Sequence, residues 1–162
     1  MDVICAIESR RSIRRYKQES IPNEKLNKLL EAARLAPSAG NRQPWELIVV
    51  TNKETLKKLP RACKDQKFVS ECSVFIAGIG DPQQKWYQVD LAIAFEHIAL
   101  AAVELGLGSC WIGAFYEEEI KQILSVPENK AVVACMTIGI PAESPEARPR
   151  KSIKELVHWE RY

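Results

Sequence analysis

The feature that most constrains the fold is a long apolar segment at residues 88–105. Its composition predicts a helix with little polar surface, and such a helix is stable only when most of its faces are covered. Glu96 and Glu104 interrupt the apolar run, so it does not predict a membrane span. Gly106 and Gly108 follow and end the helix. The chain must therefore build a core around this segment.

Shorter patterned segments alternate between helix and strand around it. Helices are predicted at residues 2–10, between the N-cap Asn23 and Pro37, and at residues 53–65, 117–124 and 152–157. Strands are predicted at residues 46–51, 74–79, 109–115 and 131–140, the first of them as a buried strand. Because strands and helices interleave, the class is α/β or α+β. Without repeats or an internal linker, residues 1–162 are predicted to form a single domain.

The charge balance and the cysteines argue against several functions. The 23 basic and 21 acidic residues leave a formal charge of +2, which gives no general attraction to nucleic acid or to an anionic membrane. The five cysteines are odd in number and form no C-x-x-C pair, so neither a disulfide framework nor a metal site is indicated. The N-terminus lacks the pattern of a signal peptide. We therefore expect a cytoplasmic protein that binds neither nucleic acid nor membrane.

The first candidate binding segment is Arg10–Arg15, with the sequence RRSIRR. Arginine presents a rigid fork of N–H donors that matches pairs of phosphate oxygens, and the serine hydroxyl adds another donor. A solvated helix end explains the run equally well, because cations are favoured near the C-terminal end of a helix.

Three further segments carry groups that suit a ligand. The loop Ala36–Trp45 is dense in hydrogen-bonding residues, of which three can face a ligand or simply form turns: Ser38, Asn41 and Gln43. The run Gly108–Gly113 allows a flat ring to approach backbone N–H groups closely, or forms a core strand. The basic cluster Arg148–Lys151 supplies more phosphate ligands, or is a solvated tail.

In this order, the four segments resemble the FMN-dependent nitroreductase family. The matching motifs are RRSxR near the start, APSxxNxQPW after the second helix, LGxGSCWIG after the apolar helix, and RPRK near the end. The resemblance covers residues 2–157. It implies an α+β fold in which helices flank a central, mostly antiparallel sheet. It also implies an intertwined homodimer with FMN at the subunit interface.

The resemblance assigns roles to residues at both ends of the chain. The FMN phosphate and ribityl chain would be held by Arg10, Arg11 and Ser12, and Arg148 and Arg150 would add to the phosphate site. Arg14 would lie beside the flavin pyrimidine, near N1 and O2, where a fixed cation stabilises the charge of the reduced ring. The partner chain would contribute Ser38, Asn41 and Gln43. Trp111, Ile112 and Gly113 would lie along the ring face and the N5 edge, and Gln66 at the pyrimidine edge.

The implied chemistry is hydride transfer from NADH or NADPH to flavin N5, and then to a small acceptor such as a nitroaromatic or a quinone. This mechanism requires no catalytic side chain, and His97 in the apolar helix is predicted to be a packing residue. Trp86 and Tyr87 are the aromatic lid candidates, with interface packing as the alternative. The competing functions are a non-catalytic FMN-binding or sensory module, a dehalogenating or flavin-cleaving enzyme, and nucleic-acid binding through Arg10–Arg15.

Overall fold

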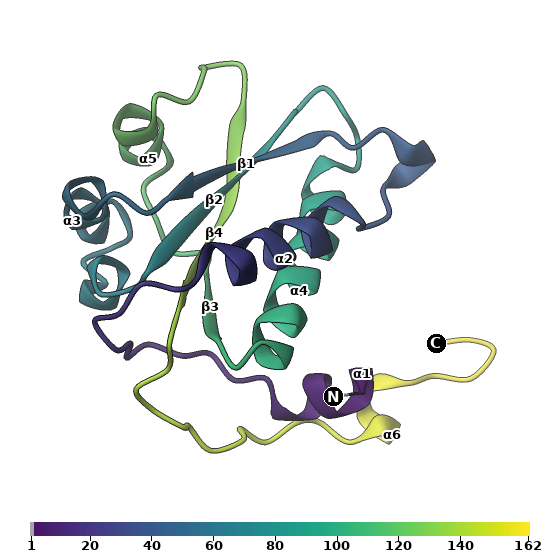
Figure 1. The fold of residues 1–162 in the computed structure, drawn as a ribbon. Helices are drawn as coiled ribbons and strands as arrows, with labels where there is room; N and C mark the ends of the chain where they lie inside the picture. The colour runs from purple at the N-terminus through teal and green to yellow at the C-terminus, as the bar shows by residue number, and fades with distance from the viewer. Residues whose placement is uncertain (1) are drawn as a thin grey trace.

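The computed structural model describes residues 2–162 as an α+β fold in which helices flank one four-stranded sheet (Figure 1). The helices are α1 (Val3–Ser9), α2 (Asn23–Arg34), α3 (Lys53–Ala62), α4 (Tyr87–Glu104), α5 (Glu117–Leu124) and α6 (Ile153–Leu156), with short 3-10 helices η1 (Ala39–Asn41) and η2 (Lys67–Ser70). The strands are β1 (Trp45–Val50), β2 (Val74–Gly80), β3 (Gly108–Ile112) and β4 (Ala131–Gly139). The predicted α+β class is confirmed.

The sheet has the strand order β1-β2-β4-β3, and each neighbouring pair runs antiparallel. In the central pair, Val74 of β2 lies opposite Ile138 of β4. Successive side chains of a strand point to opposite faces. Accordingly, Val74 and Ile76 pack in one core cluster, whereas Phe75 and Ala77 pack in the other. The predicted antiparallel sheet is confirmed.

Helix α4 lies with α2 on one face of the sheet, and α3 and α5 cover the opposite face (Figure 1). The buried apolar side chains of α4 recur at helical spacing and are Leu91, Ala94, Phe95, Ile98, Ala99 and Ala102. Leu29 and Ala33 of α2 complete this layer. The sheet and α2 thus supply much of the cover that the apolar segment requires. Among residues 2–162, no helix is both long enough and apolar enough to cross a membrane.

Three predicted details of the elements are wrong. Asn23 is the first residue of α2, and the N-cap is Pro22, which makes no side-chain cap hydrogen bond. β3 ends at Ile112, before residue 115, because the following chain turns toward α3, where the Tyr116 N–H donates to the Ala62 carbonyl (2.7 Å). β1 is mostly half-buried, because it lies at the edge of the sheet.

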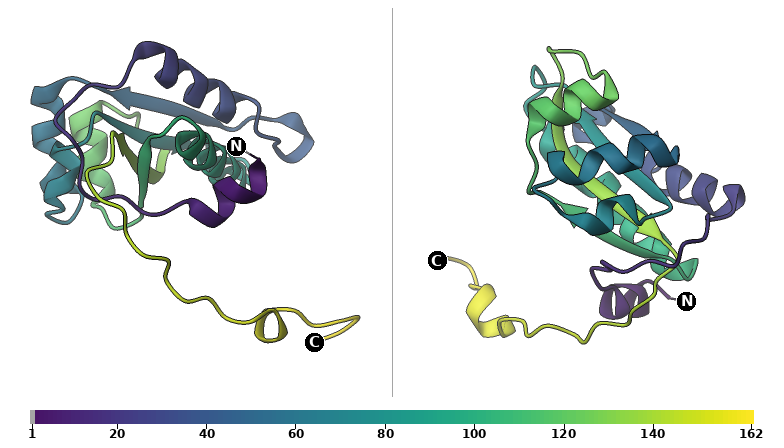
Figure 2. Two further views of the ribbon diagram at one scale, coloured as in Figure 1. Left: turned by 60° about the horizontal axis from the view of Figure 1, so that its bottom comes forward. Right: turned by 90° about the vertical axis from the view of Figure 1, so that its left-hand side faces the viewer.

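The two ends of the chain expose apolar side chains that the rest of the chain does not cover. Asp2 caps α1 by accepting the Cys5 N–H (2.9 Å), and the outer face of this helix exposes Val3, Ile4 and Ile7. After β4 the chain leaves the body of the protein (Figure 2). This tail exposes Ile153, Leu156, Trp159 and Tyr162. Exposed apolar surfaces of this kind suit contact with another chain.

Candidate functional site

Basic residues from the two ends of the chain line a single surface groove of about 570 Å³. This arginine groove contains six of the predicted ligands, namely Arg10, Arg11, Ser12, Arg14, Arg148 and Arg150. Ile7, Glu8, Glu143, Pro145, Glu146 and Ala147 complete its walls. The fold therefore brings together two basic clusters that lie at opposite ends of the sequence.

Backbone pairing to β3 fixes the N-terminal wall of the groove. The Ile13 N–H donates to the Ser109 carbonyl (2.9 Å), and Ser12 forms a parallel bridge with Ser109. Ile13 packs so closely over Gly108 that an added Cβ at 108 would lie 2.7 Å from Ile13 Cγ1. The segment after α1 is therefore bound to the sheet edge, and is more than a solvated helix end.

The C-terminal wall is held against the same segment. The Ala142 N–H donates to the Arg15 carbonyl (2.9 Å), and Tyr16 forms a bridge with Pro141. The Glu143 carboxylate accepts the backbone N–H groups of Arg14 and Arg15, the second at 3.1 Å. Sequence reasoning missed Glu143, because an acidic residue in an irregular tail has no pattern that indicates its partner.

The groove has more positive than negative charge, and its cations are weakly paired. Arg10 Nε lies 3.9 Å from a carboxylate oxygen of Glu96 on α4. Arg11 donates to the carbonyls of Glu8 (2.7 Å) and Arg10 (2.9 Å), and Arg150 donates to carbonyls of its own tail. A carbonyl orients a guanidinium without neutralising its charge. The groove can therefore bind a phosphate through charge-assisted hydrogen bonds.

The thiols near the groove and in the core remain protonated at neutral pH. Burial raises the pKa of Cys110 on β3, although Arg14, Ser12 and Arg10 act in the opposite direction. Burial also raises the pKa of Cys63 and of Cys72 to about 12. All five cysteines are free, and residues 2–162 contain no cluster of His, Cys, Asp and Glu that could hold a metal ion. The described site therefore offers no activated thiol.

The loop from Ser38 to Gln43 lies apart from the arginine groove, at the start of β1 (Figure 1). Gly40, Asn41 and Gln43 have left-handed φ angles of 57°, 54° and 50°. The Ser38 hydroxyl accepts the Gln43 N–H (3.0 Å), and the Gln43 side chain donates to the Asn41 carbonyl (3.1 Å). Within the described chain, Ser38, Asn41 and Gln43 do not line the arginine groove.

The outer edge of β3 extends from the arginine groove and pairs with no other strand in residues 2–162. The Ser109 carbonyl faces this edge, so the backbone groups of Trp111 face it by alternation, and Gly113 follows directly after the end of the strand. The Trp111 ring packs against Phe95, with centroids 5.2 Å apart, and Ile112 is only 2% exposed. The backbone of Ile112 faces β4 by the same alternation and its side chain is buried, so Ile112 offers no group to the outer edge. Nothing lies within 4 Å of an added Cβ at Gly113.

Gln66 lies beside the end of this edge. Its side-chain amide donates to the carbonyls of Cys63 (2.7 Å) and Ala114 (3.1 Å). The second bond links the segment after α3 to the residue after Gly113. The structure thus brings Gln66 close to Gly113, at the C-terminal end of β3.

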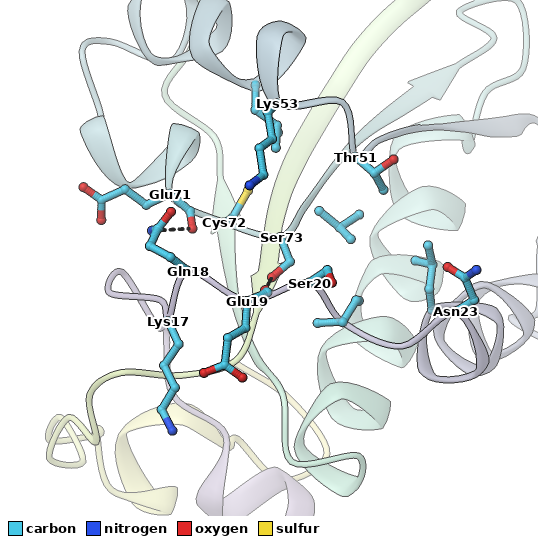
Figure 3. Close-up of a pocket in the computed structure, with 14 residues that line it drawn as sticks. Lys17, Gln18, Glu19, Ser20, Asn23, Thr51, Lys53, Glu71, Cys72 and Ser73 are labelled. Atoms are coloured by element: carbon cyan, nitrogen blue, oxygen red, sulfur yellow. Dashed lines mark hydrogen bonds between the residues drawn. The ribbon is translucent and has the colours of Figure 1, made fainter.

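A larger cavity of about 650 Å³ contains none of the predicted site residues (Figure 3). It lies where the segments around residues 17–23, 51–56 and 71–74 meet. Gln18 donates to the Glu71 carbonyl (3.4 Å) across it. Its charged lining residues are two lysines and two glutamates, so it lacks the excess of cations found in the arginine groove.

The remaining predictions concern α4 and the residue before it. The His97 Nδ1 lies 3.1 Å from the Ala32 carbonyl of α2, which fits the predicted packing role. An added Cβ at Gly80 would collide with the Tyr87 ring, so Tyr87 packs on the sheet and is not a free lid. Trp86 is exposed, and both interpretations of it stay open. Sequence reasoning missed Asp90, a buried carboxylate in the first turn of α4.

Comparison with known proteins gives a consistent result. The family model described as the nitroreductase family matches residues 7–72 and 68–140. A relative from Methanothermobacter thermautotrophicus, named "Putative NADH dehydrogenase/NAD(P)H nitroreductase", is 38% identical over 91% of this chain and 82% of its own length. A relative of the same name from Archaeoglobus fulgidus is 40% identical over 85% of this chain and 84% of its own length.

Solved structures agree in fold over nearly the whole chain. The FMN-dependent nitroreductase from Clostridium difficile R20291 has a TM-score of 0.90 and 34% sequence identity, and the match covers 98% of this chain and 99% of that chain. The NADPH:FMN oxidoreductase from Vibrio harveyi, solved with NAD+, has a TM-score of 0.92 and 27% identity. That match covers 99% of this chain and 77% of the other.

Proposed function

The chain belongs to the nitroreductase family, and from this premise we propose that it uses FMN to pass electrons from NADH or NADPH to a small acceptor. Family membership confirms the resemblance identified in the sequence and the enzyme class, an NAD(P)H-dependent flavin oxidoreductase. The choice of FMN, the hydride route and the kind of acceptor are the proposal. A nitroaromatic or a quinone is the acceptor we propose.

The arginine groove is the observation that carries this proposal. Five arginines and Ser12 line one open groove. This donor set fits a terminal phosphate, which offers several acceptor oxygens to the forks of Arg10 and Arg11. Arg148 and Arg150 would contact the same phosphate from the tail. A mononucleotide flavin ends at this phosphate, which favours FMN over FAD.

The free edge of β3 is where we place the flavin ring. Its outward backbone N–H at Trp111 can donate a hydrogen bond to the ring edge, and Gly113 leaves room for a flat group. Arg14 lines the groove beside this edge, which supports its proposed place at the pyrimidine. Gln66 lies near the other end of the edge.

The redox chemistry would come from the cofactor, since bound FMN accepts a hydride at N5 and delivers it to an acceptor. This chain's residues would bind, orient and stabilise charge. A positive side chain at Arg14 favours the reduced, anionic ring over the oxidised, neutral ring. The protonated thiols of the core take no part.

We propose that the working form is a homodimer that shares its sites. Support comes from the exposed apolar face of α1 and from the exposed apolar side chains of the tail, which a second copy of the chain would cover. The separation of the Ser38–Gln43 loop from the arginine groove gives further support. In the dimer, Ser38, Asn41 and Gln43 would reach the flavin of the partner subunit.

The oxidoreductase proposal is tested by anaerobic titration of the FMN-loaded protein with NADH and with NADPH. We expect one of these nucleotides to bleach the flavin absorbance, and a nitroaromatic or a quinone to restore it. Free FMN with the same nucleotide is the control. Protein that binds FMN but is reduced by neither nucleotide would instead be a non-catalytic flavin-binding or sensory module. Protein that binds no FMN would refute the cofactor assignment.

The ring position is tested by a matched pair of glycine variants. Gly113→Ala adds a methyl group where no protein atom lies within 4 Å, so the melting temperature of the apoprotein should change little. FMN affinity should fall by about tenfold, because overpacking costs about 1–3 kcal/mol. Gly108→Ala should instead lower the stability of the apoprotein by about 1–3 kcal/mol, because its Cβ meets Ile13. Unchanged FMN affinity in Gly113→Ala would exclude the ring from this edge.

A further inference from the structure

Asp90 is a buried carboxylate that the fold of a single chain does not fully explain. It lies in the first turn of α4 and is only 3% exposed. One carboxylate oxygen accepts the backbone N–H of Ala39 at 3.0 Å. Within residues 2–162, the other oxygen is buried and has no hydrogen-bond partner. A buried carboxylate with one unpaired oxygen lowers the stability of the fold. We therefore look for its role in the group that the other oxygen binds.

The bound oxygen holds the loop from Ser38 to Gln43. This loop contains left-handed residues at Gly40, Asn41 and Gln43. A left-handed conformation costs a non-glycine residue free energy and persists only when neighbouring structure enforces it. The loop therefore needs an anchor to keep its shape.

The anchor has to come from outside the loop. The Ser38 hydroxyl with Gln43, the Gln43 side chain with Asn41, and Arg42 with the Ala39 carbonyl (2.9 Å) all join loop residues to one another. In the described part of the chain, Asp90 is the side chain that ties this loop to the rest of the protein by a hydrogen bond. Its charge makes this bond stronger than one between neutral groups.

The cavity beside Asp90 fits an anchor better than it fits a separate ligand site. It is small, about 220 Å³, and its walls are the loop itself, Pro44 and the residues just before α4, Gln84–Trp86. Arg42 and Lys85 line it together with Asp90. Arg42 and Lys85 are both exposed, and neither forms an ion pair with Asp90 within residues 2–162.

We infer that Asp90 is a positioning residue, which holds the Ser38–Gln43 loop in the shape that contacts the flavin of the partner subunit. This inference rests on the proposed function. Asp90 itself does not touch the cofactor. Its effect reaches the flavin through Ala39 and then through the side chains that follow it in the loop.

The test removes the hydrogen bond between Ala39 and Asp90 in two ways, by changing its acceptor and by changing its donor. Asp90→Ala removes the acceptor. Ala39→Pro removes the donor, and it suits the backbone because Ser38 is extended (φ −141°, ψ 155°), as a residue before proline should be. Each variant should weaken FMN binding by about tenfold or more, the scale of a hydrogen bond to a charged group. The double variant should lose little more than either single variant, because both changes remove the same bond.

Two further readouts separate positioning from a general structural role. Asp90→Asn keeps an oxygen that accepts the Ala39 N–H, and it should restore FMN affinity to within about threefold of wild type. The melting temperature of the Asp90→Ala apoprotein should not fall, because the variant also removes a poorly paired buried charge. At saturating FMN, kcat should return close to the wild-type value.

The possible failures are distinguishable. Wild-type protein that binds no FMN would refute the proposed function, whatever the variants do. Wild-type protein that binds FMN, with Asp90→Ala and Ala39→Pro binding it equally well, would refute only the role of Asp90. Additive losses in the double variant, or a lower apoprotein melting temperature in Asp90→Ala with no rescue by asparagine, would assign Asp90 to the stability of α4 instead.

Discussion

Replacing Arg10 by alanine is expected to weaken FMN binding by about 1.5–3 kcal/mol, which is roughly a 10- to 150-fold increase in the dissociation constant. Arg10 lines the arginine groove, and its side chain is mostly shielded from solvent, at 23% exposure. Its nearest carboxylate, on Glu96, is 3.9 Å away, so most of its hydrogen-bonding capacity is available to a phosphate. Such a partly shielded cation is less screened by salt than one on the open surface.

Titration of the apoprotein with FMN measures this loss. Arg61→Ala is the matched control, because Arg61 lies on α3, is 84% exposed, and pairs with Glu119 only at 3.8 Å. The control should bind FMN as wild type does. Equal affinity in Arg10→Ala and Arg61→Ala would show that the phosphate does not bind in the arginine groove.

Deleting residues 152–162 is expected to weaken the dimer by at least about a hundredfold. The deleted segment carries the exposed apolar side chains Ile153, Leu156, Trp159 and Tyr162. Burying one such side chain against a partner contributes about 1.5–3 kcal/mol, and a hundredfold loss corresponds to about 2.7 kcal/mol. The four side chains together would contribute more than this, but the entropy lost when the tail becomes ordered on the partner offsets much of the excess. Arg148 and Arg150 are retained, so the groove keeps its cations.

Analytical ultracentrifugation over a range of concentrations measures this effect. Lys154→Ser is the control, because it changes a polar residue of the same segment, and it should leave the dimer intact. The truncated chain should also bind FMN more weakly, because a monomer lacks the Ser38–Gln43 loop that we assign to the partner subunit. A truncated chain that dimerises as tightly as wild type would place the interface elsewhere.

The core of this fold follows from local patterns in the sequence. The apolar spacing in residues 88–105 gives α4 to within one residue at each end. The continuous apolar runs near residues 74 and 131 give the two central strands. The predicted end of an element was wrong where a contact between residues distant in the sequence determines it. β3 ends early because Tyr116 bonds to Ala62, and no local pattern indicates that bond.

Less of the candidate site than of the core could be predicted from local sequence patterns. Neither basic cluster indicates by itself that Arg10–Arg14 and Arg148–Arg150 share a groove, and only the family resemblance paired them. Glu143 and Asp90 were missed for the same reason, since each bonds to backbone N–H groups distant in the sequence. For Asp90 a signal existed. A carboxylate inside an apolar helix requires a buried partner, and this indicates a specific contact.

The central claim is that each FMN site combines the arginine groove of one subunit with the Ser38–Gln43 loop of the other. Mixed dimers test it most directly. One chain carries Arg10→Ala and the other carries Ser38→Ala with Asn41→Ala, and each pure variant should bind FMN weakly. In a doubly tagged mixed dimer, the intact groove of the second chain meets the intact loop of the first. We predict that each mixed dimer recovers one site of wild-type affinity for FMN, whereas uniformly weak binding in mixed dimers would show that groove and loop of the same chain form the site.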